Sequence, residues 1–156
     1  MPNVSRSALV EYSAEQMYIL VKDIERYPAF LDWCGYAAIE EAIDSSGEGE
    51  GDSVLATVGV KYQGINKRFT TRNINTGNSN TGFAIDMELV EGPFSKLVGR
   101  WEFNKLSSSA SKVSLNLEFE IKSILMRPLL TTVFAKIADR QVGAFCRRAD
   151  IVYASG

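Results

Sequence analysis

Histidine is absent from this chain of 156 residues, and cysteine occurs only twice. Without histidine there can be no Ser-His-Asp or Cys-His catalytic arrangement and no His-ligated metal site. The side chain that most often transfers protons near neutral pH is also missing. Cys34 and Cys146 lie far apart in the sequence, so they form neither a CxxC redox pair nor a zinc knuckle. Each cysteine is therefore interpreted as a small buried hydrophobe.

Long apolar runs are missing too. No stretch of about 18 apolar residues could span a bilayer. The first residues, MPNVSRSALVEYSAE, have neither the apolar core of a secretory signal nor an Arg-rich leader, which predicts a cytoplasmic protein. Apolar residues nevertheless make up 46% of the chain and charged residues 23%, the balance of a globular protein. The length predicts one domain over residues 1–156.

The N-terminal third predicts a strand followed by two short helices. VSRSALVEY (4–12) is expected to be the strand, and Ser13 is a good N-cap for a helix in SAEQMYILVKDIERY. Pro28 either ends this helix or starts a new short turn, because proline has no N–H to donate. Six acids and no base lie in 40–52. Their spacing is not that of a calcium loop, so a solvated hairpin tip is predicted.

From residue 53 to about 121, apolar residues recur at every second position. This pattern predicts antiparallel strands with one buried and one solvated face. The inward positions are Val54, Ala56, Val58, Val60 and Tyr62, then Phe83, Ile85, Met87 and Leu89, then Leu97, Gly99, Trp101 and Phe103, then Val113, Leu115, Leu117, Phe119 and Ile121. The turn-rich segments TGNSNTG and LSSSASK mark hairpins. In the clearest strands the acids fall on outward positions.

The segment MRPLLTTVFAKIADRQVGAFCRRADIVY predicts a helix of roughly 25 residues, about 38 Å long, with Pro128 near its first turn. Helical periodicity places apolar residues on one stripe: Leu130, Phe134, Ile137, Ala138, Phe145, Ala149 and Val152. Lys136, Arg140 and Arg147 lie on the opposite side, Gln141 lies within the stripe, and Arg148 lies at its edge.

These elements predict an α+β fold. A curved antiparallel sheet of six to seven strands would wrap around the long C-terminal helix, with two short helices after the first strand. The helix cannot fill the whole concavity of such a sheet. We therefore expect a cavity between sheet and helix, apolar with a few polar groups.

Several motifs carry a resemblance to a known family. FTTRN (69–73), LVEGPFSKLVGRWEF (89–103) and AFCRRADIVY (144–153) resemble those of the coenzyme Q-binding START-like proteins, a group of polyketide cyclase/dehydrase-like helix-grip proteins. The order of the elements resembles the START-like helix-grip fold, from YSAEQMY to the end of the chain. YPAFLDWC (27–34) resembles the family's aromatic-rich turn, which usually has proline where this chain has Asp32.

The resemblance implies two activities, neither of them enzymatic. Mitochondrial members bind ubiquinone and support respiration. For this chain that implies a bound ubiquinone or other lipid, no catalytic cofactor, and contact with the periphery of the inner membrane. A bacterial member is a toxin that binds the large ribosomal subunit and blocks subunit association, which makes that subunit the alternative partner. Neither activity involves DNA.

Large side chains directed at the concavity are the candidate ligand contacts: Tyr27, Phe30, Trp33, Met87, Leu89, Trp101, Phe103, Leu117, Phe119, Phe134 and Gln141. The alternative is that they only fill a core. Gln141 is expected to bond either a quinone oxygen or a backbone carbonyl of the sheet, because a buried polar group needs a partner. Tyr27, Phe30 and Trp33 would cover the cavity mouth, touch a membrane, or form a second small core.

Basic residues are the candidate contacts with ribosomal RNA, whose phosphates they can neutralise: Lys61, Lys67, Arg68, Arg72, Lys136, Arg140 and Arg147. A charged helix face is more often only solvated, and an isoelectric point of about 5.3 is low for an RNA-binding protein. Arg72 is expected to form an ion pair across strands with Asp86 or Glu88.

An enzyme would need acidic side chains that face the cavity and can act as general acid or base. Asp23 and Asp32 are the acids expected at the helix end of the cavity, where a carboxylate pair facing solvent is ordinarily structural. No Gly-rich phosphate loop, nucleophile elbow or metal-ligand cluster is present in the sequence. The sequence therefore predicts a binding protein with no catalytic residues and no metal.

Overall fold

The computed structural model describes residues 2–43 and 51–154. Its elements, in chain order, are β1 (Asn3–Val10), α1 (Ala14–Lys22), the 3₁₀ turn η1 (Ile24–Arg26), α2 (Tyr27–Phe30), β2 (Cys34–Ile43), β3 (Asp52–Tyr62), β4 (Ile65–Asn78), β5 (Gly82–Glu91), β6 (Phe94–Ser107), β7 (Ala110–Ile121) and α3 (Arg127–Tyr153). Most of the predicted acidic hairpin tip lies in 44–50, outside the described residues.

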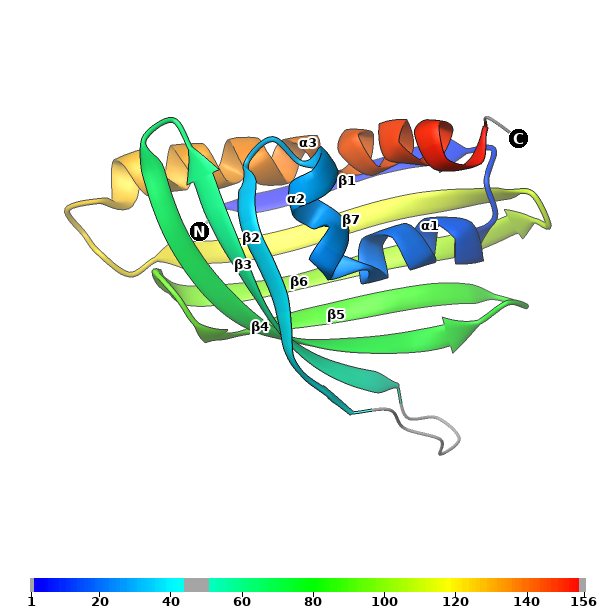
Figure 1. The fold of residues 1–156 in the computed structure, drawn as a ribbon, viewed down its shortest axis with the longest axis horizontal. Helices are drawn as coiled ribbons and strands as arrows, with labels where there is room; N and C mark the ends of the chain where they lie inside the picture. The colour runs from blue at the N-terminus through cyan, green and yellow to red at the C-terminus, as the bar shows by residue number, and fades with distance from the viewer. Residues whose placement is uncertain (1, 44–50, 155–156) are drawn as a thin grey trace.

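The seven strands form one antiparallel sheet in the order β1-β7-β6-β5-β4-β3-β2. In Figure 1 the strands curve around a concavity, with α3 along the top of the view and α1 and α2 on the near side. α3 contacts β1, β7 and α1, while α1 contacts β5, β6 and β7. The predicted α+β fold, a curved sheet around a long C-terminal helix with short helices after β1, is confirmed.

The chain enters α1 as predicted but leaves it earlier. Ser13 is the N-cap: its Oγ accepts from Gln16 N–H at 3.1 Å, and Gln16 Oε1 accepts from Ser13 N–H at 2.9 Å. The helix ends at Lys22, because Asp23 leaves the helical region with ψ 68°. Pro28 then stands in the first turn of α2, where the lack of an N–H costs nothing, so it starts a new turn.

α3 buries most of its predicted apolar stripe, from Leu130 to Ala149. The prediction for Val152 is wrong, since that side chain is 42% exposed. Tyr153 takes the inward position in the last turn: its ring centroid lies 5.8 Å from that of Tyr12, and its hydroxyl donates to the carbonyl of Gln16 at 2.9 Å. None of the helices within 2–43 and 51–154 is long and apolar enough to cross a membrane.

The strands alternate as predicted, with the concave face buried. On β3, Val54, Ala56, Val58 and Val60 are all buried. A two-residue turn, Gln63–Gly64, joins β3 to β4, and both residues have positive φ (49° and 84°). This tight hairpin pairs Tyr62 with Ile65 and fixes which side chains of β4 face the concavity.

Candidate functional site

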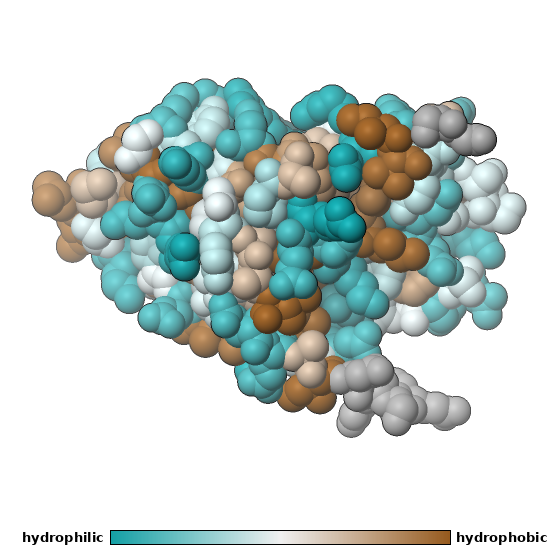
Figure 2. Space-filling view, viewed as in Figure 1, coloured by the Kyte–Doolittle hydropathy of each residue, from teal (hydrophilic) through white to brown (hydrophobic). Residues whose placement is uncertain are grey.

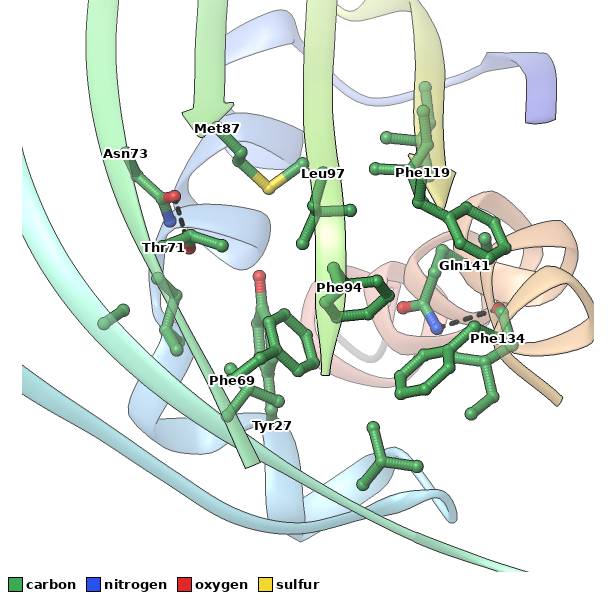
Figure 3. Close-up of a pocket in the computed structure, with 18 of the residues that line it drawn as sticks. Tyr27, Phe69, Thr71, Asn73, Met87, Phe94, Leu97, Phe119, Phe134 and Gln141 are labelled. Atoms are coloured by element: carbon green, nitrogen blue, oxygen red, sulfur yellow. Dashed lines mark hydrogen bonds between the residues drawn. The ribbon is translucent and has the colours of Figure 1, made fainter. Parts of the chain in front are cut away.

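A cavity of about 130 Å³ lies between the concave face of the sheet and α3. Figure 3 shows Phe69, Phe94, Phe119 and Phe134 around it. The rings of Phe94 and Phe134 meet edge to face with centroids 4.8 Å apart, and those of Phe69 and Phe94 are 5.5 Å apart. Such offset aromatic contacts make a rigid, largely apolar wall.

Most of the predicted ligand contacts line this cavity: Tyr27, Trp33, Met87, Trp101, Leu117, Phe119, Phe134 and Gln141. They come from the three strands β5, β6 and β7, from α3, and from the aromatic-rich segment between α1 and β2. The structure therefore brings together side chains that lie far apart in the sequence. Whether they contact a ligand remains a prediction.

Three predicted contacts lie outside the cavity. Phe103 is fully buried beneath α1, with its ring centroid 5.8 Å from that of Tyr18. Leu89 follows the last residue of β5 that pairs with β6, Glu88, so it lies where the two strands separate. Phe30 lines a neighbouring cleft instead. Alternation places the first two on the correct face, but α1 and the divergence of the strands remove them from the cavity.

Other lining residues were not predicted. Phe69, Thr71 and Asn73 line the cavity from β4, and Phe94 and Leu97 line it from β6. The signal for the β4 residues is the alternation within FTTRN, which places Thr71 and Asn73 on the same face as Phe69. In this protein, the polar residues Thr71 and Asn73 at inward positions of β4 therefore form part of the cavity wall.

Polar side chains interrupt the apolar wall at two places. Thr71 Oγ1 donates to Asn73 Oδ1 at 2.8 Å, and both side chains are buried (Figure 3). On the opposite wall, Gln141 Nε2 donates to the carbonyl of Ile137 at 3.0 Å. The expected carbonyl partner on the sheet is therefore wrong, because the carbonyl one turn earlier in α3 is within reach of the Gln141 side chain.

The aromatic-rich segment packs onto α3. The rings of Tyr27 and Phe30 each lie 5.5 Å from the ring of Phe145, and Trp33 is buried. Burial raises the pKa of Tyr27, whose hydroxyl donates to the carbonyl of Val21. Tyr27 and Trp33 of this segment therefore form part of the cavity wall, and Phe30 packs beside it.

Both cysteines are free thiols. Cys34 is buried at the start of β2, where its thiol donates to the carbonyl of Tyr36 at 3.3 Å. Burial raises the pKa of Cys34 and also that of Cys146. Because the thiolate is the reactive form, both positions disfavour cysteine chemistry.

A polar cleft of about 240 Å³ adjoins the cavity. It shares three lining residues with the cavity: Trp33, Ile137 and Gln141. Its other walls include Asp32, which is exposed, together with Arg140 and Arg147 of α3. The shared residues place this charged cleft directly beside the apolar cavity.

Four exposed bases lie where the end of the β3–β4 hairpin meets α3, and we call them the basic face: Lys67, Lys136, Arg140 and Arg147. The predicted bases Lys61 and Arg68 are also exposed, but the strand register places them on the convex side of the sheet, where Arg68 lies 3.7 Å from the ring centroid of Tyr36. Tyr62 connects the two elements: Arg140 Nη1 donates to its hydroxyl at 3.2 Å, and Lys136 Nζ lies 5.9 Å from its ring centroid. Figure 2 shows mostly hydrophilic side chains over the hairpin and the adjoining part of α3. Within the described residues, none of these four bases forms an ion pair.

The remaining predicted base, Arg72, does not form the expected ion pair. Its Nη1 donates to Ser53 Oγ at 3.0 Å, and no ion pair joins it to the described residues Asp86 and Glu88. Asp86 instead pairs with Arg100, which lies directly opposite it on β6, at 2.6 Å. Arg72 is half-buried and stays apart from the basic face.

The acids considered for catalysis are not inside the cavity. Asp32 is exposed in the polar cleft, and Asp23 is exposed with its carboxylate 3.9 Å from Arg26 Nε. Across residues 2–43 and 51–154, no three side chains of His, Cys, Asp or Glu are grouped so that they could hold a metal ion. The cavity walls thus offer hydrogen bonds and apolar surface.

A curved antiparallel sheet around a long C-terminal helix, with an apolar cavity between them, defines a START-like helix-grip protein. The chain belongs to the polyketide cyclase / dehydrase and lipid transport family, whose sequence profile matches residues 10–146. It is 43% identical over 155 residues to the ribosome association toxin RatA of Escherichia coli strain K12, covering 99% of this chain and 91% of that protein.

Two solved structures have the same fold. A START superfamily protein from Mycobacterium smegmatis superposes with a TM-score of 0.76 at 20% identity, covering 96% of this chain and 98% of the other. The Zhui aromatase/cyclase from Streptomyces sp. R1128 gives 0.78 at 16% identity, covering 99% and 98%. The same fold therefore occurs in an enzyme, so function must be argued from the site.

Proposed function

We propose that this protein associates with the ribosome through the basic face, as a RatA-type toxin that binds the large subunit and blocks subunit association. The similarity to RatA extends over 99% of the chain, so the proposal concerns the whole protein and not one motif. The observation that supports it is that the bases of the basic face form no ion pair within residues 2–43 and 51–154. Cations without acidic partners in the protein are available to neutralise RNA phosphates.

The test is sedimentation of the purified protein with isolated bacterial ribosomal subunits on a sucrose gradient. The protein is expected in the large-subunit fractions, and the whole-ribosome peak should shrink as protein is added. The proposal is contradicted if the protein stays at the top of the gradient and the whole-ribosome peak is unchanged.

A second candidate function is non-enzymatic binding of an apolar ligand in the cavity, with ubiquinone or a related polyprenyl quinone as the candidate and support of respiration as its role. The observation that favours it is the aromatic and aliphatic lining of the cavity. The nearest acids considered for catalysis are exposed outside it, which favours holding a ligand over transforming it.

The size of the cavity limits how such a ligand would bind. Its volume of about 130 Å³ is close to that of an engineered cavity of roughly 150 Å³ that holds benzene. A cavity of this size accommodates about one ring, so a polyprenyl chain would extend out of it along the protein surface.

Organic extraction of gently purified protein, followed by mass spectrometry, tests this second function. A quinone or another lipid should be present at a substantial fraction of the protein concentration. An extract without any lipid, from protein that also fails to take up added short-chain quinone, would contradict it.

A further inference from the structure

Gln141 presents its amide oxygen to the cavity. Its Nε2 donates to the carbonyl of Ile137 at 3.0 Å, and a carbonyl can only accept, so the nitrogen must be the atom that faces α3. Figure 3 shows Oε1 directed the other way, on the side of Phe94. No hydrogen bond from the described part of the chain reaches Oε1, although the side chain is only 9% exposed.

Oε1 is not fully enclosed, because among the described residues only Trp33 Nε1 is a fully buried side-chain polar atom without a partner. A ligand that displaces water from Oε1 without donating to it leaves this acceptor unsatisfied at a cost in free energy, and a ligand with a donor avoids that cost. A quinone carbonyl or an ether oxygen cannot do so, because it only accepts hydrogen bonds. Such a group near Oε1 would bring two acceptors together in an apolar environment. A hydroxyl group can donate to Oε1, and its oxygen can also accept a hydrogen bond.

Other polar groups of the lining leave donors unused. Because Asn73 Oδ1 accepts from Thr71, its Nδ2 remains a donor, and no acceptor for it lies in the described residues. Trp33 Nε1 also lacks an acceptor among the residues described, but it is fully enclosed and does not count as a contact for a ligand. The cavity therefore combines one unused acceptor on α3 with one unused donor, Asn73 Nδ2, on the sheet wall, which suits a ligand that both donates and accepts.

We propose that the cavity selects a ring that carries a hydroxyl group, which donates a hydrogen bond to Gln141 Oε1. It should therefore bind a phenol or a hydroquinone more tightly than the corresponding ether or quinone. This inference rests on the second proposed function, the binding of an apolar ligand in the cavity. It names the chemical form of that ligand and assigns Gln141 as the residue that determines specificity.

Two isomeric ligands test the proposal: 4-ethylphenol and 4-methylanisole. They have the same atoms and nearly the same size, but only the phenol can donate a hydrogen bond. The two tryptophans of the chain, Trp33 and Trp101, both line the cavity, so their fluorescence can follow a titration of the full-length protein. The phenol is expected to bind about tenfold more tightly.

The two variants Gln141→Met and Met87→Leu separate hydrogen bonding from cavity shape. Gln141→Met keeps the length of the side chain and removes the acceptor, so the ether, which is the more hydrophobic isomer, should bind at least as tightly as the phenol. Met87→Leu changes the same cavity without touching a polar group, and the preference for the phenol should persist.

The outcomes of these titrations distinguish failure of this inference from failure of the second proposed function. Equal binding of the two isomers to the unmodified protein would overturn the inference and leave the binding function intact. A preference for the phenol that survives Gln141→Met would overturn the assignment to Gln141. If neither isomer binds, the second proposed function fails, and this inference fails with it. Should Gln141→Met not fold, the comparison of the isomers on the unmodified protein still decides.

Discussion

The two sides of α3 carry opposite chemistry along the same 27 residues. The inward side, with Phe134, Ile137 and Phe145, is buried against the sheet and the aromatic-rich segment. The outward side presents Lys136 and Arg140, which are exposed and meet the β3–β4 hairpin through Tyr62. One helix can therefore serve a cavity and a charged surface with different side chains. Single substitutions should affect one side without the other.

The largest effect is expected from Phe145→Ala on the inward side. Phe145 is 1% exposed, and the rings of Tyr27, Phe30 and Trp101 each lie 5.5 Å from its ring. Removing it should lower the free energy of unfolding by about 3–5 kcal/mol, measured by urea denaturation. Arg147→Ala, on the outward side, should change it by less than about 0.5 kcal/mol. Similar losses in the two variants would contradict the contrast between the sides.

The next effect concerns the outward side. Replacing Lys136, Arg140 and Arg147 together by alanine should weaken binding to the large ribosomal subunit at least tenfold at a fixed salt concentration. The slope of log affinity against log salt should become shallower by about one for each lost phosphate contact. The free energy of unfolding should change little. Binding can be measured by sedimentation with isolated subunits over a series of salt concentrations.

The matched control for that triple variant removes the same charge from the far strands and the loop after β7. Lys105, Lys112 and Lys122 are all exposed, and none forms an ion pair within the described chain. Their replacement by alanine should leave binding to the subunit within about twofold. An equal loss in the two triple variants would mean that net charge, and not the basic face, determines binding.

A smaller effect is expected from Gly99→Ala, which narrows the cavity from the sheet side. A Cβ at Gly99 would lie 2.7 Å from Met87 Cε and from Leu117 Cδ1, two atoms at the flexible ends of lining side chains. The fold should tolerate this change, because those ends can move into the cavity. Affinity for 4-ethylphenol should fall severalfold in a fluorescence titration. Unchanged affinity would indicate that the ligand does not occupy this part of the cavity.

The smallest effect is a pH dependence of the free energy of unfolding, which comes from a buried tyrosine. Burial raises the pKa of Tyr18 to about 12, and its ring stacks on Phe83 with centroids 4.4 Å apart. Between about pH 10 and 12 the unfolded chain releases this proton while the folded chain keeps it, so the unfolded state is favoured as pH rises. The free energy of unfolding should fall from about pH 10 upward. Tyr18→Phe should reduce that fall, and an identical fall in the variant would exclude Tyr18 as a contributor.

Much of the fold could be predicted because it depends on periodicity. The alternation at Val54–Val60 and the helical stripe from Leu130 to Ala149 specify which face is buried, and both are confirmed. The depth of each inward residue could not be predicted in the same way. Phe103 has the correct face, but α1 fills the space above it, and no local pattern records how a distant helix packs.

The hydrogen-bond and ion-pair partners of individual side chains could not be predicted from the local sequence either. Gln141 was expected to bond either a quinone oxygen or a carbonyl of the sheet, yet its own helix offers the carbonyl of Ile137 at 3.0 Å. Arg72 was expected to pair with an acid, yet Arg100 lies directly opposite Asp86 and occupies it. Both differences come from competition among nearby groups in three dimensions, which the sequence pattern does not contain.

Sedimentation of two variants with large ribosomal subunits tests the separation of the two sides of α3 most directly. The first is the Lys136, Arg140 and Arg147 alanine variant, and the second is Gly99→Ala. We predict that the first is lost from the subunit fractions while it still binds 4-ethylphenol, and that the second sediments with the subunit like the unmodified protein. Loss of both variants from the subunit fractions, or retention of the first, would contradict the account.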